Sequence, residues 1–267
     1  MEKRRYALRI AYRGDAFRGF QRQPGLPSVQ ECLERALRPL GLAGRIDAAA
    51  RTDAGVHALC QVVTFWARAE HEPGALRAAV NAATPPELWC LAAARVPPSA
   101  HARAGARQRR YLYLVGTPPP ESLRPYAWSL PDERAFPGAA AAALDAAAMR
   151  TALSAAVGEH DFAGFARPGE QRGTRRTLLS AEVVAADGMP LWALVFTGRG
   201  FLRAMARNLA GTAVAVGLGL APPGRVAEIL SAPGRYRGVR APGWGLTLAS
   251  VDYDPPLFPV APPGWTG

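Results

Sequence analysis

Residues 6–12, YALRIAY, alternate between two kinds of side chain. The large apolar groups of Tyr6, Leu8, Ile10 and Tyr12 fall on one face, and small or charged groups fall on the other. This period of two predicts a half-buried β-strand. The segments that follow the strand decide which kind of sheet contains it.

A helix is predicted next, over residues 28–40, SVQECLERALRPL. Ser28 stands three residues before Glu31, which is the spacing of a capping box at a helix N-terminus. Apolar residues recur at helical spacing and form one face, made of Val29, Cys32, Leu33, Ala36, Leu37 and Leu40. The segment therefore predicts an amphipathic helix.

The rest of the N-terminal part predicts a short strand before Arg51, a strand at 59–66, a helix at 75–83 and a strand at 89–96. The resulting order is strand, helix, strand, strand, helix, strand. This is the order of the ferredoxin-like split unit, in which an antiparallel sheet carries its helices on one face.

The C-terminal part repeats this order loosely. Strands are predicted at 108–115, 178–186, 191–197 and 246–251, and helices at 144–157, 202–216 and 225–231. We therefore predict an α+β fold of two ferredoxin-like, RRM-like halves, residues 1–105 and 106–267. Together they would form a mixed, mainly antiparallel sheet with helices on one face and a cleft between the halves.

The charge of the chain points to an acidic partner. The 267 residues carry 32 Lys and Arg against 21 Asp and Glu, a net charge of +11. A basic surface attracts nucleic acid through phosphate contacts, and the same field attracts an anionic membrane surface. Lys3 is the only lysine, and a chain so rich in Arg, Ala, Gly and Pro also fits codon bias.

The sequence contains no pattern that predicts membrane insertion, a metal site or a disulfide framework. The N-terminus lacks an apolar stretch of signal-peptide length, and the apolar segment 209–221 is shorter than the roughly 20 residues needed to span a bilayer. Cys32, Cys60 and Cys90 form no CxxC pair and match no zinc or disulfide framework. We expect a cytoplasmic protein with a buried helix at 209–221 and no metal site.

Residues 50–58, ARTDAGVHA, gather Arg, Thr, Asp, Gly and His between two predicted strands. A carboxylate beside a glycine on such a loop is accessible to a ligand at a place where the backbone allows close approach. The same residues also fit a simple turn in which Asp53 bonds its own backbone. The segment alone leaves both interpretations open.

The same segment resembles the GRTDAGVHA signature of the tRNA pseudouridine synthase A family, with Ala50 in place of the first glycine. Further blocks match in order: YRGDAFRGFQRQ at 12–23 resembles YDGTxFxGWQxQ, RRYLY at 109–113 resembles ARRYRY, GEHDFAGF at 158–165 resembles GxHDFxxF, and FLRAMARNLAGTAVAVG at 201–217 resembles FLxxMVRNxxGxLxxVG. The resemblance extends from Tyr6 to Tyr253 and implies the pseudouridine synthase fold, with the active site in the central cleft.

The family rearranges uridine to pseudouridine in tRNA, so the resemblance implies an isomerase acting on the anticodon stem-loop, at positions 38, 39 and 40 of the tRNA. It implies that Asp53 is the nucleophile. Breaking the N-glycosidic bond and rejoining the uracil through carbon asks for a compact ionised nucleophile at the anomeric carbon or at C6, and a carboxylate serves both routes. No redox or phosphate-transfer step is involved, so no cofactor is expected. The implied partners are tRNA and a second copy of the chain in a homodimer.

Three further residues match active-site residues of the family. Arg207 matches the arginine that pairs with the catalytic Asp, and a neighbouring cation favours the ionised carboxylate. Tyr111 matches the tyrosine that packs on the target base; Tyr113 lies on the same face of its strand, and the motif register selects Tyr111. Arg51 matches the arginine assigned to base flipping. His57, a single histidine in this loop, is interpreted as a structural hydrogen bonder.

Two segments are expected to contact the RNA backbone. Residues 100–104, AHARA, resemble the family's FHARF, with both phenylalanines replaced by alanine, and offer His101 and Arg103 as phosphate contacts. A second family segment corresponds to residues 167–172. Its candidates for contact with tRNA are Arg167, Gln171 and Arg172.

Two other classes of function compete with the isomerase. A noncatalytic RNA-binding module on the same fold needs basic and aromatic residues, but a carboxylate among phosphates would repel its ligand. Hydrolytic cleavage of a nucleoside usually uses two carboxylates, whereas the signature loop supplies only Asp53, and Asp15 and Asp47 lie outside the matched pattern. The presence of Asp53 together with Arg51, Tyr111 and Arg207 favours the isomerase.

Overall fold

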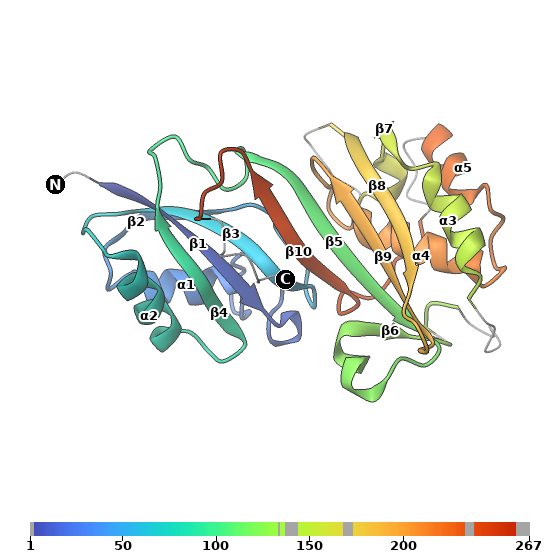
Figure 1. The fold of residues 1–267 in the computed structure, drawn as a ribbon, viewed down its shortest axis with the longest axis horizontal. Helices are drawn as coiled ribbons and strands as arrows, with labels where there is room; N and C mark the ends of the chain where they lie inside the picture. Colours follow the sequence, from blue (N-terminus) through green and yellow to red (C-terminus); the bar gives the residue numbers. More distant parts are fainter. Residues whose placement is uncertain (1–2, 133, 137–143, 168–172, 233–237, 260–267) are drawn as a thin grey trace. The chain divides into compact units, whose positions relative to one another are not determined.

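A computed structural model describes residues 3–132, 134–136, 144–167, 173–232 and 238–259 (Figure 1). The chain has an α+β fold and forms two compact units. Unit 1 consists of residues 1–54, 58–108 and the C-terminal residues from 250 onward, and unit 2 consists of residues 55–57 and 109–249. The main division falls between Gln108 and Arg109, three residues after the predicted boundary, and the described residues 250–259 belong to unit 1.

Unit 1 has the predicted order of elements. These are β1 (Arg4–Tyr12), α1 (Val29–Leu37), β2 (Leu42–Ala48), β3 (His57–Ala67), α2 (Pro73–Ala83) and β4 (Leu88–Arg95). β1 is antiparallel to β3 on one side and to β4 on the other, and β2 pairs antiparallel with β3. The helices α1 and α2 contact each other, and Figure 1 shows both on one face of this sheet.

The cap and the apolar face predicted for α1 are confirmed. The backbone N–H of Glu31 donates a hydrogen bond to the side chain of Ser28, with 3.4 Å between the two atoms. Val29, Cys32, Leu33, Ala36 and Leu37 are buried. The helix ends at Leu37, earlier than predicted, and the chain turns through Gly41, whose φ of +78° is the left-handed region that glycine adopts most readily.

The strand β1 begins at Arg4, two residues before the predicted stretch, and within that stretch Ala7, on the face predicted to be exposed, is fully buried. Tyr6, Leu8 and Ile10 are buried as expected, but Arg5 on the opposite face is only 7% exposed. Its guanidinium donates hydrogen bonds to the carbonyl of Ala100 and the hydroxyl of Thr64. The alternating pattern did not reveal this, because an arginine in a strand normally indicates the solvent face.

Unit 2 contains the second set of strands and helices. They are β5 (Ala106–Gly116), which begins in unit 1, β6 (Ala127–Ser129), α3 (Ala146–Ser154), β7 (Gly158–Asp161), β8 (Arg175–Ala185), β9 (Leu191–Gly198), α4 (Met205–Gly217) and α5 (Arg225–Ser231). β5, β9, β8 and β7 are neighbours in that order and all antiparallel, and β6 adds to β5 in parallel. The helix α3 packs against α4 and β8.

The last strand, β10 (Leu246–Tyr253), contributes residues to both units. Its residues 246–249 belong to unit 2 and its residues 250–253 to unit 1. In unit 2, the N–H of Leu114 donates to the carbonyl of Gly245 just before the strand, and in unit 1 the hydroxyl of Tyr253 donates to the carbonyl of Ala102.

The helix α4 is the centre of the unit 2 core. Every one of its residues except Arg207 is buried. This confirms the predicted buried helix over residues 209–217, but the helix ends at Gly217, and Leu220 in the rest of the predicted stretch is 53% exposed. Close packing requires Gly217 on this helix, because a Cβ there would lie 2.7 Å from Cγ of Met149 on α3. Across the described residues, no helix is both long and apolar enough to cross a membrane.

Several details of unit 2 differ from the prediction, and β6 is one element that the sequence did not predict. α3 begins at Ala146 instead of residue 144, because the carboxylate of Asp145 accepts hydrogen bonds from the N–H groups of Ala147 and Ala148 and so acts as the N-cap. The strand β7 was not predicted, since its four residues, GEHD, lack the apolar alternation of a strand.

Candidate active site

The signature loop that follows β2 is anchored at Ala50 by the buried side chain of Gln61 on β3. The amide nitrogen of Gln61 donates to the carbonyl of Ala50 at 2.8 Å, and its amide oxygen accepts from the N–H of Ala50 at 3.2 Å. Gln61 is fully buried. A buried amide that satisfies both backbone groups of one residue fixes the position of the loop at that residue.

Thr52, directly before Asp53, forms a second anchor. Its hydroxyl lies 2.8 Å from the hydroxyl of Tyr12 at the end of β1, and its carbonyl accepts a hydrogen bond from the N–H of Phe20. The amide nitrogen of Gln61 also donates to the Tyr12 hydroxyl, at 3.4 Å. Burial raises the pKa of Tyr12 to about 12, so this phenol stays protonated and remains a hydrogen-bond donor.

Gly19 supports the loop from the opposite direction. It has φ of +103°, and a Cβ at this position would lie 3.0 Å from the carbonyl oxygen of Thr52 and 3.3 Å from the nitrogen of Ala54. Only glycine allows the backbone to approach the loop so closely. The block at 12–23 and the signature at 50–58 are therefore in contact in the structure.

The anchored loop presents two of the predicted site residues within unit 1. Asp53 is half-buried, and Arg51 is exposed. Both neighbours of Arg51 are held by hydrogen bonds to buried side chains, Ala50 by Gln61 and Thr52 by Tyr12. The backbone that carries the carboxylate is therefore fixed in advance, as a positioned nucleophile requires.

Tyr111 lies in unit 2 on β5. It is 8% exposed, and its ring packs edge-to-face on Phe201 with 4.9 Å between the ring centroids. Tyr113, two residues on, is fully buried and donates its hydroxyl to the carbonyl of Pro242. Burial also raises the pKa of Tyr113 well above its usual value. Tyr113 is thus a core residue, while Tyr111 keeps some exposed surface.

Arg207 projects from the first turn of α4, also in unit 2. Its Nε donates to the carbonyl of Ala241 at 2.8 Å, and the N–H of Ala241 donates to the carbonyl of Arg207 at 3.3 Å. The helix begins directly after Ala204, which has φ of +64°, a left-handed conformation that is unfavourable for a residue with a Cβ. Strained residues of this kind occur preferentially at functional sites.

His57 is a buried residue of unit 2, and its predicted hydrogen-bonding role stays a prediction. It is 3% exposed, and its ring lies against Tyr126 with 4.9 Å between the centroids. A buried histidine packed on an aromatic ring is typical of a core residue, which agrees with its omission from the catalytic set.

His101, one of the predicted RNA contacts, is engaged within unit 1. Its Nδ1 accepts from the N–H groups of Arg103 and Ala104, at 3.1 and 3.3 Å, and its Nε2 lies 3.6 Å from a carboxylate oxygen of Asp47. The ring therefore caps its own loop and leaves Arg103 exposed. The N–H of Ala102 also donates a hydrogen bond to the hydroxyl of Thr64. Hydrogen bonds of backbone N–H groups therefore help to hold this loop, in which alanines replace the two phenylalanines of the family segment.

Arg167 is exposed at the end of the 3₁₀ helix segment 163–165, and its N–H donates to the carbonyl of Arg203. Gln171 and Arg172 lie outside the described residues. The structure therefore gives a position to Arg167 alone among the three residues predicted in this segment.

The two other carboxylates near the signature in sequence have arginine partners. Asp15 pairs with Arg13 at 2.6 Å, and Asp47 pairs with Arg5 at 3.2 Å. Because each is paired with an arginine, neither is a good candidate for the second catalytic carboxylate that hydrolysis usually requires. In the described part of the chain, no three metal-binding side chains gather at one place.

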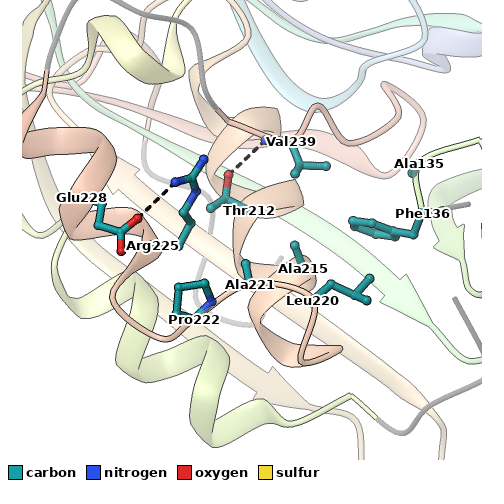
Figure 2. A pocket seen from close by; sticks show the side chains of 10 residues that line it. All are labelled: Ala135, Phe136, Thr212, Ala215, Leu220, Ala221, Pro222, Arg225, Glu228 and Val239. Atoms are coloured by element: carbon teal, nitrogen blue, oxygen red, sulfur yellow. Dashed lines mark hydrogen bonds and ion pairs between the residues drawn. The ribbon is translucent and has the colours of Figure 1, made fainter.

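Unit 2 contains a cavity of about 350 Å³, and none of the predicted site residues lines it (Figure 2). It is lined by Ala135, Phe136, Thr212, Ala215, Leu220, Ala221, Pro222, Arg225, Glu228 and Val239. Its two charged side chains, Arg225 and Glu228, pair with each other at 3.1 Å, and Thr212 is bonded to Asn208 and Val239. A mainly apolar lining whose polar groups are already paired offers no chemistry for catalysis.

Comparison of the sequence with known protein families and proteins shows the class of protein to which the chain belongs. The family model for tRNA pseudouridine synthase matches residues 9–103 and 152–254, which include Arg51, Asp53 and Arg207 but leave out Tyr111. The chain is 35% identical to tRNA pseudouridine synthase A of Shouchella clausii, over 97% of each chain. It is 39% identical to the same enzyme of Solidesulfovibrio magneticus (94% of this chain, 92% of the relative) and 38% identical to that of Paracoccus denitrificans (95% and 98%). The chain therefore belongs to the tRNA pseudouridine synthase A family.

Sequence reasoning missed the residues that hold the loop. Tyr12 and Gly19 belong to the block at 12–23, and Gln61 lies three residues after the signature, but the sequence assigned no loop-holding role to any of them. Gln61 carried a usable signal, because a lone amide among the apolar residues of a central strand requires a buried hydrogen-bond partner.

Proposed function

We propose that this protein isomerises uridine to pseudouridine in the anticodon stem-loop of tRNA, at positions 38, 39 and 40. The observation that carries the proposal is the anchored loop 50–54, which bears the family signature and presents Asp53 on a fixed backbone. The membership of the chain in its family supplies the substrate class.

The reaction balances without any other reactant. The bond between C1′ of the ribose and N1 of the uracil breaks, and a bond between C1′ and C5 forms. C5 loses a proton, and N1 gains one. The Asp53 carboxylate is the nucleophile, and attack at C1′ or at C6 would hold one fragment covalently while the uracil turns.

The other site residues have separate roles in this proposal. Arg207 provides the positive charge that favours the ionised form of Asp53. Tyr111 packs against the target base, and Arg51 occupies the space that the flipped uridine leaves in the stem. The RNA backbone is contacted by five residues, His101, Arg103, Arg167, Gln171 and Arg172. His101 also caps the loop that carries Arg103.

We further infer that the protein acts as a homodimer in the cytoplasm, since the family resemblance implies that one tRNA contacts two subunits. Sedimentation equilibrium of the purified protein tests the dimer directly. A monomer that still modifies tRNA would contradict this part of the proposal and leave the reaction intact.

The test uses an unmodified tRNA transcript with uridines in the anticodon arm. The protein is incubated with it, and pseudouridine is mapped by carbodiimide-dependent stops in primer extension. We expect stops in the anticodon arm with the wild type and none with Asp53→Asn, although the variant still binds tRNA. Tight binding without stops would favour the noncatalytic module, and release of free uracil would favour hydrolysis.

A further inference from the structure

We propose that Trp244 is a further substrate-binding residue, whose indole ring stacks on a nucleobase of the RNA next to the target uridine. The inference rests on the proposed function, because it takes RNA to be the ligand at the Asp53 loop. It concerns a residue outside the blocks that carry the family resemblance.

Trp244 stands on a rigid turn of unit 2. The N–H of Leu246 donates to the carbonyl of Gly243 at 3.0 Å and closes the turn. The hydroxyl of Tyr113 donates to the carbonyl of Pro242 at 3.1 Å, and the N–H of Leu114 donates to the carbonyl of Gly245 at 2.9 Å. The turn is therefore anchored to β5 on both sides of Trp244.

Glycine at 245 is a requirement of this anchoring. A Cβ there would lie 2.6 Å from Cζ of Tyr113, so no larger residue fits without displacing a fully buried ring. Ala241, just before the turn, exchanges two backbone-directed hydrogen bonds with Arg207. The segment that carries Trp244 is thus fixed to the same arginine that we assign to the active site.

The turn also lies against the signature loop. Gly55 and Trp244 both belong to unit 2, and a Cβ at Gly55 would lie 3.5 Å from the nitrogen of Trp244. Only two peptide units connect Gly55 to Asp53, which limits the distance between their Cα atoms to about 7 Å. The backbone of Trp244 therefore packs against Gly55 of the same signature segment that includes Asp53 in the chain.

The side chain itself is suited to an RNA ligand. Trp244 is 43% exposed, whereas Trp128 in the same unit is 1% exposed and donates its indole N–H to Asp132. Two exposed arginines of unit 2 are Arg240, four residues before Trp244, and Arg203, four residues before Arg207. Aromatic rings interspersed with arginines are the usual composition of surfaces that bind unpaired bases, because the ring stacks on the base while the cations face phosphates.

The test compares four variants with the wild type on the same tRNA transcript: Trp244→Ala, Trp244→Leu, Trp244→Phe and Trp89→Ala. Trp89 is the matched control, because it is 44% exposed on β4 of unit 1. We measure the Kd for tRNA, the rate of pseudouridine formation at saturating enzyme, and the thermal unfolding midpoint.

Loss of one stacked base predicts a Kd about tenfold higher for Trp244→Ala. Trp244→Leu should resemble the alanine variant, Trp244→Phe should retain most of the affinity, and Trp89→Ala should match the wild type. The rate at saturation should stay unchanged, since stacking beside the reacting base acts on ground state and transition state alike.

An unchanged Kd for Trp244→Ala in an active protein would overturn the stacking role and leave the proposed function intact. Equal tRNA affinities for Trp244→Leu and Trp244→Phe would also overturn the stacking role, because they would show that an apolar side chain without an aromatic ring is enough for binding. If the wild type bound tRNA without modifying it, the proposed function would fail, and the Kd series would still decide whether Trp244 stacks on RNA. If Trp244→Ala lowers the unfolding midpoint, its Kd no longer reports stacking alone. The test is then decided by comparing the Kd of Trp244→Leu with that of Trp244→Phe.

Discussion

The hydroxyl oxygen of Tyr12 lies 2.8 Å from that of Thr52, the residue directly before Asp53. This contact joins the end of the central strand β1 to the signature loop. Gln61 completes the network by donating to Tyr12 and to the carbonyl of Ala50. Because these side chains are buried, water cannot replace a lost partner, and the loop is held in one arrangement.

Tyr12→Phe should therefore weaken both the fold and the reaction. The change removes one hydroxyl and leaves the buried hydroxyl of Thr52 and the amide of Gln61 with one partner fewer. We expect the free energy of unfolding to fall by about 1–3 kcal/mol and the rate of pseudouridine formation to fall with it. Urea denaturation and single-turnover kinetics on tRNA measure the two effects.

Tyr6→Phe is the control for that variant. Tyr6 lies on the same strand and is equally buried, and its hydroxyl accepts a hydrogen bond from the N–H of His71 at 2.8 Å. We expect a similar loss of stability but an unchanged rate at a temperature where both variants are folded. If Tyr6→Phe slowed the reaction as much as Tyr12→Phe, the effect would reflect stability alone and not the position of the loop.

Stability should decline at alkaline pH in a defined window. Burial raises the pKa of Cys90 from 9.0 to about 12 and that of Tyr12 from 10.0 to about 12. Between these values the groups are ionised in the unfolded chain and protonated in the folded one, so ionisation favours unfolding. The two groups make their full contribution to the free energy of unfolding below pH 9, and this contribution is lost as the pH rises to about 12.

The free energy of unfolding, measured by urea denaturation from pH 8 upward, should therefore fall above pH 9. Cys90→Ser removes one of the titrating groups, and its curve should fall less steeply between pH 9 and 10. The slopes are compared, because the substitution also changes the stability at neutral pH. A parallel pair of curves would show that the thiol of Cys90 is not shielded in the folded protein.

Gly19→Ala tests the close approach of the loop at 12–23 to the signature loop. The new Cβ would lie 3.0 Å from the carbonyl of Thr52, a backbone atom that cannot move aside, and φ of +103° is unfavourable for alanine. We expect a loss of about 2 kcal/mol or more in the free energy of unfolding, together with reduced pseudouridine formation. Gly25→Ala, at φ of +70° with no atom within 4 Å, should lose only about 1 kcal/mol and keep its rate.

Local patterns in the sequence predicted most of the elements, because their causes are local. The capping box at Ser28 and the apolar face that follows it define α1, and the alternation in residues 6–12 defines β1. The four polar residues of β7 form a strand only because β8 pairs with them, and no local pattern records that pairing. The burial of Arg5 likewise depends on Ala100 and Thr64, which are distant in sequence.

The candidate site shows the same limit. The signature loop could be found from its own residues and its resemblance to a family, and the assignment of Asp53, Arg51, Tyr111 and Arg207 remains a prediction. The choice between Tyr111 and Tyr113 required the motif register, since a period of two places both on one face. The contact of Gly55 with the turn at Trp244 joins residues far apart in the chain, and periodicity and spacing contain no information about it.

The left-handed backbone at Ala204 offers a final prediction, in which the same chemical change has opposite effects at two places. Ala204 precedes α4 at φ of +64° and ψ of 0°, a conformation that costs an L-residue roughly 1–2 kcal/mol relative to glycine. Ala204→Gly should therefore raise the free energy of unfolding by about 1 kcal/mol, net of the greater entropy of the unfolded chain. Ala78→Gly, at an exposed position within α2, should lower it by about 1 kcal/mol. Urea denaturation of both variants checks the signs. Destabilisation by Ala204→Gly would mean that the alanine methyl packs favourably enough to outweigh the strain, and the start of the helix that carries Arg207 would then be held by that contact.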